Sequence, residues 1–90
     1  MSITFGQLAV IDEMHSKTTL AWSNITVKEL LERLALQYNF SLEKIILAGD
    51  VLNRELVILI NGVSIDKASG LFTVIKDGDS VLLMGIVSGG

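Results

Sequence analysis

One stretch decides the fold: TVKELLERLALQY, residues 26–38, has the pattern of an amphipathic helix. It opens with a capping box, in which the Thr26 hydroxyl accepts from the backbone N–H of Glu29 and the glutamate carboxylate reaches back. An apolar face then recurs at helical spacing, through Val27, Leu30, Leu31, Leu34 and Tyr38. Glu29 also stands four residues before Arg33, the favourable order for an ion pair. The sequence therefore predicts one main helix that begins near Val27.

A strand hairpin is expected before this helix. Residues 3–11 are mostly β-branched or apolar, as in a strand, and their alternation becomes irregular after Gly6, which predicts a bulge. Polar residues 12–17 indicate a turn, and residues 18–22 alternate again as a second strand would. We expect Trp22 to pack on the core or the sheet, with a role in an interface as the alternative.

Two interpretations remain open for the segment after the helix. Residues 41–49 fit a short helix that is capped by Ser41 and ended by Gly49. Residues 45–47 have the sequence Ile-Ile-Leu, which fits a short strand equally well. The local pattern does not choose between them.

A second hairpin is predicted further along the chain. Residues 55–60 are almost continuously apolar beyond Glu55, which predicts a strand in a central position of the sheet. Asn61-Gly62 is the strongest short hairpin signal, because both turn positions require a positive φ. Residues 63–65 would then return antiparallel to the strand.

The end of the chain supplies the last strand. Asp77-Gly78-Asp79 predicts a turn, and residues 80–87 predict a strand. Two hairpins on either side of a capped helix make a mixed sheet of four or five strands packed on one main helix. This is the β-grasp, or ubiquitin-like, arrangement of the α+β class. We expect it to form a single domain over residues 1–90, with residues 87–90 as a flexible C-terminal arm.

The composition excludes several classes of function. The 90 residues carry 7 Lys and Arg against 10 Asp and Glu, a net charge of −3, and the basic residues are scattered, which argues against nucleic acid as a partner. The absence of Cys excludes disulfides, thiolate zinc sites and cysteine nucleophiles. The longest apolar run, Leu56–Ile60, is far shorter than the roughly 20 residues that cross a bilayer, and no signal peptide is visible. We therefore expect a soluble cytoplasmic domain without a membrane partner.

Side chains that could carry catalysis are sparse. His15 is the single histidine and lies in a predicted turn without a second convergent group, so we interpret it as an ordinary exposed side chain. Asp77 and Asp79 resemble a fragment of a calcium loop, but the other ligand positions are missing and a turn explains them better. We expect no metal site and no enzyme active site.

The last residues, Val87-Ser88-Gly89-Gly90, indicate another kind of chemistry. Glycine has no Cβ, so Gly89 and Gly90 form an arm that fits a channel too narrow for other residues. The arm carries the backbone carboxylate of Gly90, which is a poor electrophile while ionised. Adenylation by ATP would convert it to a mixed anhydride that is open to attack by sulfur or a thiol. The alternative is a frayed tail without a chemical role.

Several motifs of the chain occur together in one known family. Residues 70–83, GLFTVIKDGDSVLL, and residues 87–90, VSGG, complete a pattern that also contains Asn61-Gly62 and the helix start. Over nearly the whole chain this pattern resembles the ThiS/MoaD family of ubiquitin-like sulfur carriers. The resemblance implies that an adenylating enzyme of the ubiquitin-activating type uses ATP to adenylate Gly90, and that a sulfur donor then forms a thiocarboxylate. It also implies a carrier that binds no cofactor and is not itself an enzyme.

The resemblance leaves the pathway open. The length and the segment between Asn39 and Arg54 resemble the small subunit of molybdopterin synthase. The thiocarboxylate of that subunit inserts into the synthase large subunit and supplies the dithiolene sulfur in the synthesis of the molybdenum or tungsten cofactor. The tail departs from that branch, because Gly85-Ile86 stands where its members carry a Pro-Pro pair. Molybdopterin synthesis is the leading prediction. The alternatives are a carrier for thiamin thiazole or another sulfur acceptor, and a ubiquitin-like modifier conjugated through Gly90 to protein lysines.

The final strand also predicts a partner surface. Residues 82–87 carry no charge, and alternation places one set of their side chains in the core and the other set outward. We expect Leu82, Met84 and Ile86 to point outward and bind the partner, because soluble monomers rarely expose large apolar patches. The alternative is that a neighbouring loop covers them.

Overall fold

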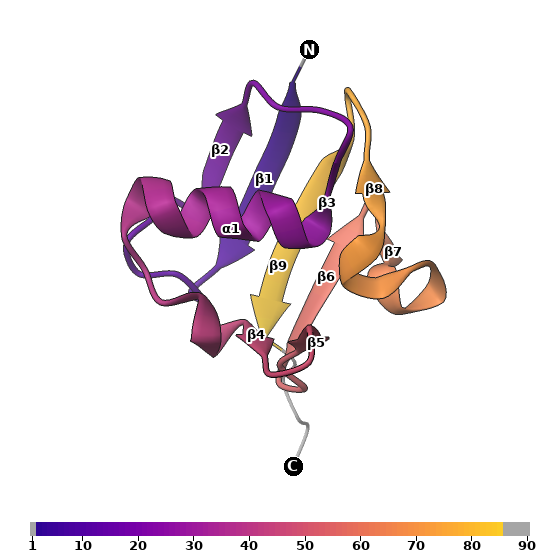
Figure 1. The fold of residues 1–90 in the computed structure, drawn as a ribbon. Coiled ribbons are helices and arrows are strands. Elements are labelled where there is room, and N and C mark those ends of the chain that lie inside the picture. The colour runs from indigo at the N-terminus through magenta and orange to yellow at the C-terminus, as the bar shows by residue number, and fades with distance from the viewer. Residues whose placement is uncertain (1, 86–90) are drawn as a thin grey trace.

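The protein folds as a five-stranded mixed sheet with one helix packed across it (Figure 1). The computed structural model describes residues 2–85, and residues 1 and 86–90 lie outside the described part. In the order β2-β1-β9-β6-β7, the strands are β2 (Lys17–Leu20), β1 (Ile3–Leu8), β9 (Ser80–Gly85), β6 (Leu56–Ile60) and β7 (Val63–Ser64). β1 is antiparallel to β2 and parallel to β9, and β9 is antiparallel to β6. This is the predicted β-grasp arrangement, so the fold prediction is confirmed.

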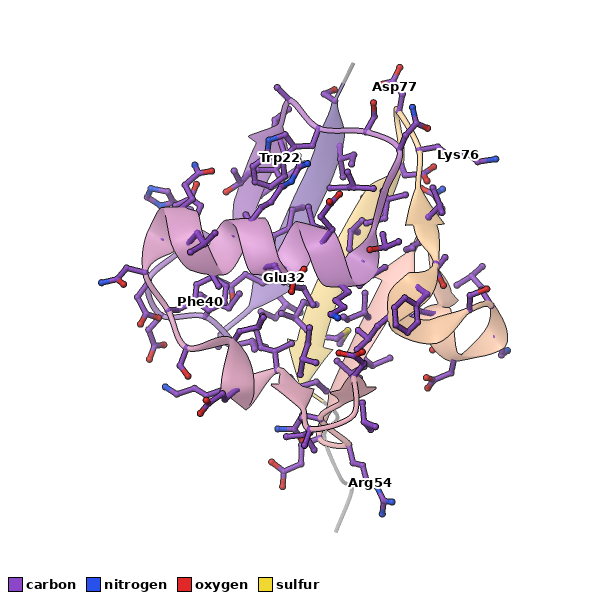
Figure 2. The ribbon with its side chains drawn as sticks, in the orientation of Figure 1. Trp22, Glu32, Phe40, Arg54, Lys76 and Asp77 are labelled. Carbon is purple, nitrogen blue, oxygen red and sulfur yellow. The ribbon has the colours of Figure 1, made fainter. Side chains whose placement is uncertain are left out.

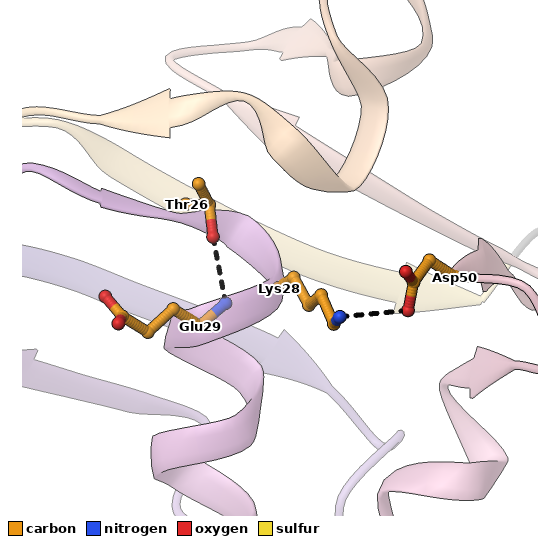
Figure 3. Close-up of polar contacts among 4 residues, drawn as sticks. All are labelled: Thr26, Lys28, Glu29 and Asp50. Carbon is orange, nitrogen blue, oxygen red and sulfur yellow. Dashed lines mark hydrogen bonds and ion pairs between the residues drawn. The ribbon is translucent and has the colours of Figure 1, made fainter.

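The main helix, α1 (Val27–Tyr38), begins at the predicted residue. Oγ1 of Thr26 accepts a hydrogen bond from the Glu29 backbone N–H at 3.1 Å, which satisfies a donor that no helical carbonyl can reach (Figure 3). Nη2 of Arg33 lies 3.6 Å from Oε2 of Glu29, the predicted pair. The fully buried side chains of α1 are Val27, Leu30, Leu31 and Leu34. No helix of residues 2–85 is long and apolar enough to cross a membrane.

The hydrophobic core lies between α1 and the inner face of the sheet. The inner-face side chains of the three middle strands with almost no exposure are Ile3, Phe5, Ile58, Val81 and Leu83. Burying one such side chain contributes about 1.5–3 kcal/mol, so this layer supplies much of the folding free energy. In the described part of the chain, the core therefore lies on the face of the sheet that α1 covers, and α1 leaves the other face open (Figure 1).

One polar side chain is buried within residues 2–85, the amide of Gln7, which is 3% exposed. Its Nε2 donates to the backbone carbonyls of Ile11 and Met14 at 2.9 and 3.1 Å. Its Oε1 accepts from the N–H groups of Val10 and Ile11, both at 2.9 Å. Gln7 thereby fixes the loop that follows β1.

The first hairpin is confirmed with corrections to β1. The strand ends earlier than predicted, at Leu8, because Ala9 takes a φ of 55° that interrupts the extended backbone. The predicted bulge at Gly6 is wrong, since the residue pairs without interruption with Lys17 on one side and Leu82 on the other. The irregular alternation reflects the missing side chain of Gly6 and no extra residue.

The second strand of this hairpin is also shorter than predicted, because β2 ends at Leu20. Trp22 lies beyond the strand and packs half-buried against the core, as expected (Figure 2). The guanidinium carbon of Arg33 lies 5.3 Å from the centroid of its ring. The indole of Trp22 therefore contacts α1 from the segment that follows β2.

The segment after α1 contains both of the structures considered for it. A 3₁₀ helix, η1 (Leu42–Lys44), comes first, and β4 (Ile46–Leu47) then pairs with β5 (Val51–Leu52). Gly49, with a φ of 80°, lies in the turn between these strands and does not end a helix. The helix is thus shorter than the predicted residues 41–49. Of the alternative strand, residues 45–47, only Ile46 and Leu47 form β4.

The central strand of the sheet is β9, and the prediction of a central β6 is wrong. β6 pairs with β9 along its length but with β7 only near residues 59 and 60. The apolar run of β6 was misleading, because only Ile58 is fully buried in the core. Val57 and Leu59 lie on the opposite face of the sheet, together with Met84 and Leu82 of β9.

A short ladder that the sequence did not predict joins β3 (Ile25–Thr26) to β8 (Val74–Ile75). Two 3₁₀ helices, η2 (Ile65–Lys67) and η3 (Gly70–Phe72), precede it where a loop was expected. The Val27 N–H donates to the carbonyl just before β8 at 3.0 Å. The ladder therefore positions the start of α1.

The predicted tight turns are confirmed. Asn61 and Gly62 have φ values of 52° and 84°, both positive as this hairpin requires. Gly78, between β8 and β9, has a φ of 86°. The Asn61 side chain joins the two turns, since its Nδ2 donates to Asp79 Oδ1 and its Oδ1 accepts from the Ser80 N–H, both at 2.9 Å.

Candidate functional site

The strand β9 lies in the middle of the sheet and ends at Gly85, the last described residue. Val81 and Leu83 are 1% and 0% exposed and belong to the core. Leu82 and Met84 alternate with them, lie on the opposite face and are half-buried. The predicted alternation is confirmed for these four residues, while the partner role of Leu82 and Met84 stays a prediction.

The outer face of the sheet carries an apolar cluster around these two side chains. In the ladders, Met84 stands opposite Leu8 of β1 on one side and Val57 of β6 on the other. Leu82 stands opposite Leu59 of β6. Paired residues share a face of a sheet, so these side chains lie together on the face that α1 leaves open (Figure 1). We call this cluster the outer patch, and it consists of Leu8, Val57, Leu59, Leu82 and Met84.

A glycine on β1 shapes the outer patch. Gly6 is paired with Leu82, and Cδ1 of Leu82 lies 3.3 Å from the position that a Cβ at residue 6 would take. Because that distance is shorter than ordinary packing, a side chain at Gly6 would require the end of the Leu82 side chain to shift slightly. Because Gly6 has no Cβ, the Leu82 side chain packs closely against the backbone of β1. Leu8, by contrast, is 55% exposed, and exposed apolar clusters of this kind mark interaction sites.

The sequence found part of this site and missed the rest. Leu82 and Met84 lie in the outer patch, where they were expected. The other predicted site residues lie outside the described part of the chain: Ile86, Val87, Ser88, Gly89 and Gly90. Leu8, Val57 and Leu59 were not predicted. For the two β6 residues the signal was available, because every second side chain of a continuous apolar run faces away from the core.

Within residues 2–85, no set of three or more His, Cys, Asp or Glu side chains could hold a metal ion. His15 is exposed, as predicted. Oδ1 of Asp77 accepts from the Ser2 N–H at 2.6 Å, and Oδ2 of Asp79 accepts from the Lys76 N–H at 2.8 Å. The Asp79 carboxylate therefore closes the turn, and the Asp77 carboxylate joins the turn to the residue before β1, so the interpretation of these residues as a turn is confirmed.

The family of the chain follows from a match to its sequence. A family model described as the ThiS family matches residues 3–90. The chain belongs to the ThiS family. It is thus a member of a group of small ubiquitin-like sulfur carriers and protein modifiers, and carriers of this type are generally not catalytic. The resemblance of the sequence to this family is confirmed.

Solved structures resemble this ThiS family member over nearly its whole length. The small archaeal modifier protein 1 from Methanosarcina acetivorans is 28% identical, with 99% of this chain and 96% of that chain covered and a TM-score of 0.76. A chain from the complex of subunits 1 and 2 of the molybdopterin-converting factor of Helicobacter pylori is 27% identical, with 100% of both chains covered and a TM-score of 0.58. CysO of Mycobacterium tuberculosis is 23% identical, with coverage of 94% and 99% and a TM-score of 0.80, and supports the fold alone. Among curated protein sequences, none matches significantly.

Proposed function

We propose that this protein is a cytoplasmic sulfur carrier that acts through the carboxylate of Gly90. A carboxylate oxygen attacks the α-phosphorus of ATP on a partner adenylating enzyme, and pyrophosphate leaves. Hydrosulfide from a sulfur donor then attacks the carbonyl carbon of the mixed anhydride, AMP leaves, and a thiocarboxylate remains on Gly90. The carrier supplies the reacting carbonyl and the partner supplies the ATP site.

The observation that carries this proposal is the ThiS family match, which extends to residue 90 and so includes Gly89-Gly90. The fold supports it, because the strand that precedes the arm in the sequence, β9, is the middle strand of the sheet. Val87 and Ser88 would begin the arm, and Gly89 would keep it narrow enough for a partner's channel. The chemistry needs no catalytic side chain from the carrier itself.

The outer patch is the surface we assign to partner docking. Leu82 and Met84 lie in its middle strand and Ile86 follows two residues later, next to the arm. A partner that binds the arm meets the end of β9 first, so the same contact would bury the outer patch. Both the adenylating enzyme and the sulfur acceptor would use this face, at different stages of the cycle.

Molybdopterin synthesis is the pathway that we propose for the sulfur. Its support is the similarity to a chain of the molybdopterin-converting factor complex, at 27% identity over the full length of both chains. The sulfur acceptor would then be the large subunit of molybdopterin synthase. Another sulfur acceptor, such as the thiamin thiazole, remains the alternative within the carrier class.

A second candidate function is conjugation of Gly90 to protein lysines. The similarity to the small archaeal modifier protein 1, at 28% identity, favours it. Both functions begin with the same adenylate, and they differ in the nucleophile that attacks it. Sulfur gives a thiocarboxylate, whereas a lysine Nζ gives an isopeptide bond to another protein.

Intact-mass spectrometry separates these functions. The protein is incubated with the purified host adenylating enzyme, ATP and sulfide, and iodoacetamide is then added to half of the sample. The carrier function predicts replacement of one oxygen by sulfur and one alkylation, whereas a variant without Gly89 and Gly90 stays unchanged. Adducts of higher mass with proteins would favour the modifier function, and an unchanged wild-type mass would overturn both.

A further inference from the structure

A hollow of about 580 Å³ lies at the end of the molecule where β9 ends. Its wall comes from the loop after β1, from η1, from the loop between β5 and β6, and from the last residue of β9. The lining residues that matter here are Leu8, Val10, Lys44, Arg54, Glu55 and Gly85. We call it the basic hollow, because two cations and one anion give it a charge of +1 in a chain whose net charge is −3.

The two cations of the basic hollow stand on a fixed backbone. Nδ2 of Asn53 donates to the Lys44 carbonyl at 3.0 Å, and the Asn53 N–H donates to the Ile45 carbonyl at 2.8 Å. Oδ1 of Asn53 accepts from the Glu55 N–H at 2.9 Å. One asparagine therefore joins η1 to the loop that carries Arg54, and it holds the backbone segments of the two cations side by side.

The opposite wall of the basic hollow contains a strained residue. Ala9 has a φ of 55°, and within residues 2–85 it is the only residue at positive φ that is not Asn, Asp or Gly. Gln7 holds it there, since its Oε1 accepts from the next two backbone N–H groups along the chain. Such strain persists only where its surroundings fix it, and it is frequent at binding sites. This wall is therefore a defined part of the fold.

Neither cation of the basic hollow has an ionic partner in the part of the chain that the structure describes. The ion pairs there are Lys28–Asp50 at 3.1 Å, drawn in Figure 3, and Arg33–Glu29 at 3.6 Å. Both involve α1. Lys44 and Arg54 are exposed, and Arg54 extends away from the body of the protein (Figure 2). Their charges are available to another molecule.

The position of the basic hollow determines which molecule covers it. Under the proposed function, the adenylating enzyme takes the arm, residues 87–90, into a narrow channel, so the mouth of that channel lies within two residues of Gly85 along the chain. Gly85 lies in the wall of the hollow, so the surface around the mouth would also cover Lys44 and Arg54. Removing water from two cations costs free energy unless opposite charge replaces it. Leu8 lies in both the hollow and the outer patch, so a single surface can cover both.

We propose that the basic hollow binds an acidic segment at the channel mouth of the adenylating enzyme, whose carboxylates pair with Lys44 and Arg54. This inference rests on the proposed function and specifies the chemistry of its first partner. Charges at the rim of an interface act chiefly on the rate of association and on the choice of partner. The hollow would thus align the arm with the channel before the apolar contacts form.

ATP–pyrophosphate exchange by the purified host adenylating enzyme, with the carrier concentration varied at low and high NaCl, tests this inference. We expect Arg54→Glu and Lys44→Glu each to lower kcat/KM for the carrier about tenfold at low salt, with kcat unchanged and a smaller effect at high salt. Glu55→Gln should raise kcat/KM, because it removes a repulsion. The matched control is Lys76→Glu, the same change of charge at the opposite end of the molecule, which should leave kcat/KM near the wild-type value (Figure 2).

The outcomes separate this inference from the proposed function. Equal kcat/KM for Arg54→Glu, Lys44→Glu and Lys76→Glu, with an active wild type, would overturn the basic hollow and leave the carrier function standing. No exchange with the wild-type protein would overturn both. Circular dichroism checks the fold of each variant. If Arg54→Glu does not fold, Arg54→Gln removes the charge without reversing it and should lower kcat/KM by a smaller factor.

Discussion

Met84 lies in the middle of the outer patch, between Leu8 and Val57, so the substitution Met84→Asp tests whether this patch binds a partner. Full burial of such a side chain contributes about 1.5–3 kcal/mol, but Met84 is already half-buried, which leaves about 1 kcal/mol to be gained on binding. An aspartate without a partner in the same apolar contact costs about 1–3 kcal/mol more. The total of about 2–4 kcal/mol raises the dissociation constant about 30-fold to 1,000-fold.

The same substitution leaves the core in place. Val81 and Leu83, on the other face of β9, keep their contacts beneath α1. Aspartate is a poor strand residue, at a cost of about 1 kcal/mol in the free energy of unfolding. For a domain of this size that cost lowers the Tm by about 4–8 °C. Met84→Asp should therefore remain folded and lose affinity by far more than it loses stability.

Isothermal calorimetry with the adenylating enzyme measures the loss, and circular dichroism follows the Tm. The matched control is Ser80→Asp, on the same strand and the same face but outside the outer patch. It should bind like the wild type. Equal affinity of folded Met84→Asp and folded Ser80→Asp would refute the assignment of this face to partner docking.

Three further substitutions test the fold, each by urea unfolding. Gln7→Leu leaves the Val10 and Ile11 N–H groups without their acceptor and should lower the free energy of unfolding by about 2–6 kcal/mol; a loss below about 0.5 kcal/mol would contradict the role given to the buried amide. Thr26→Ala removes the N-cap oxygen and should cost about 1 kcal/mol, whereas Thr26→Ser should cost much less. Gly62→Ala places a Cβ at a φ of 84° and should cost about 1–2 kcal/mol, whereas equal stability would show that the turn adapts.

The sequence predicted the elements whose signals are local. The capping box of Thr26 and Glu29 predicted the start of α1. The pair Asn61-Gly62 predicted a hairpin, and both residues have the positive φ that this turn requires. The two-residue ladder between β3 and β8 has no such signal, because each strand is too short to show alternation. The order of the strands in the sheet is likewise decided by long-range pairing. For this reason the apolar run of β6 led to the wrong prediction that β6 is the central strand.

The candidate site was predicted along one strand and missed across strands. Alternation within β9 placed Leu82 and Met84 outward, but the neighbours that complete the outer patch come from β1 and β6. Only the register brings them together, and a single sequence does not give the register. Lys44 and Arg54 are likewise brought together only by the fold, because the Asn53 side chain joins their two segments at one hollow. The chemistry predicted for the arm lies outside residues 2–85, and within them the structure describes the surfaces that precede it.

The most direct test of the carrier function is the chemical state of Gly90 in protein recovered from its own host. The protein is purified without reductant, treated with iodoacetamide and fragmented in the mass spectrometer, so that the mass of the last residue is read separately. The account predicts a fraction of molecules in which Gly90 carries one sulfur in place of oxygen and one alkyl group. Gly90 found only as an unmodified carboxylate, or sulfur located at another residue, would contradict it.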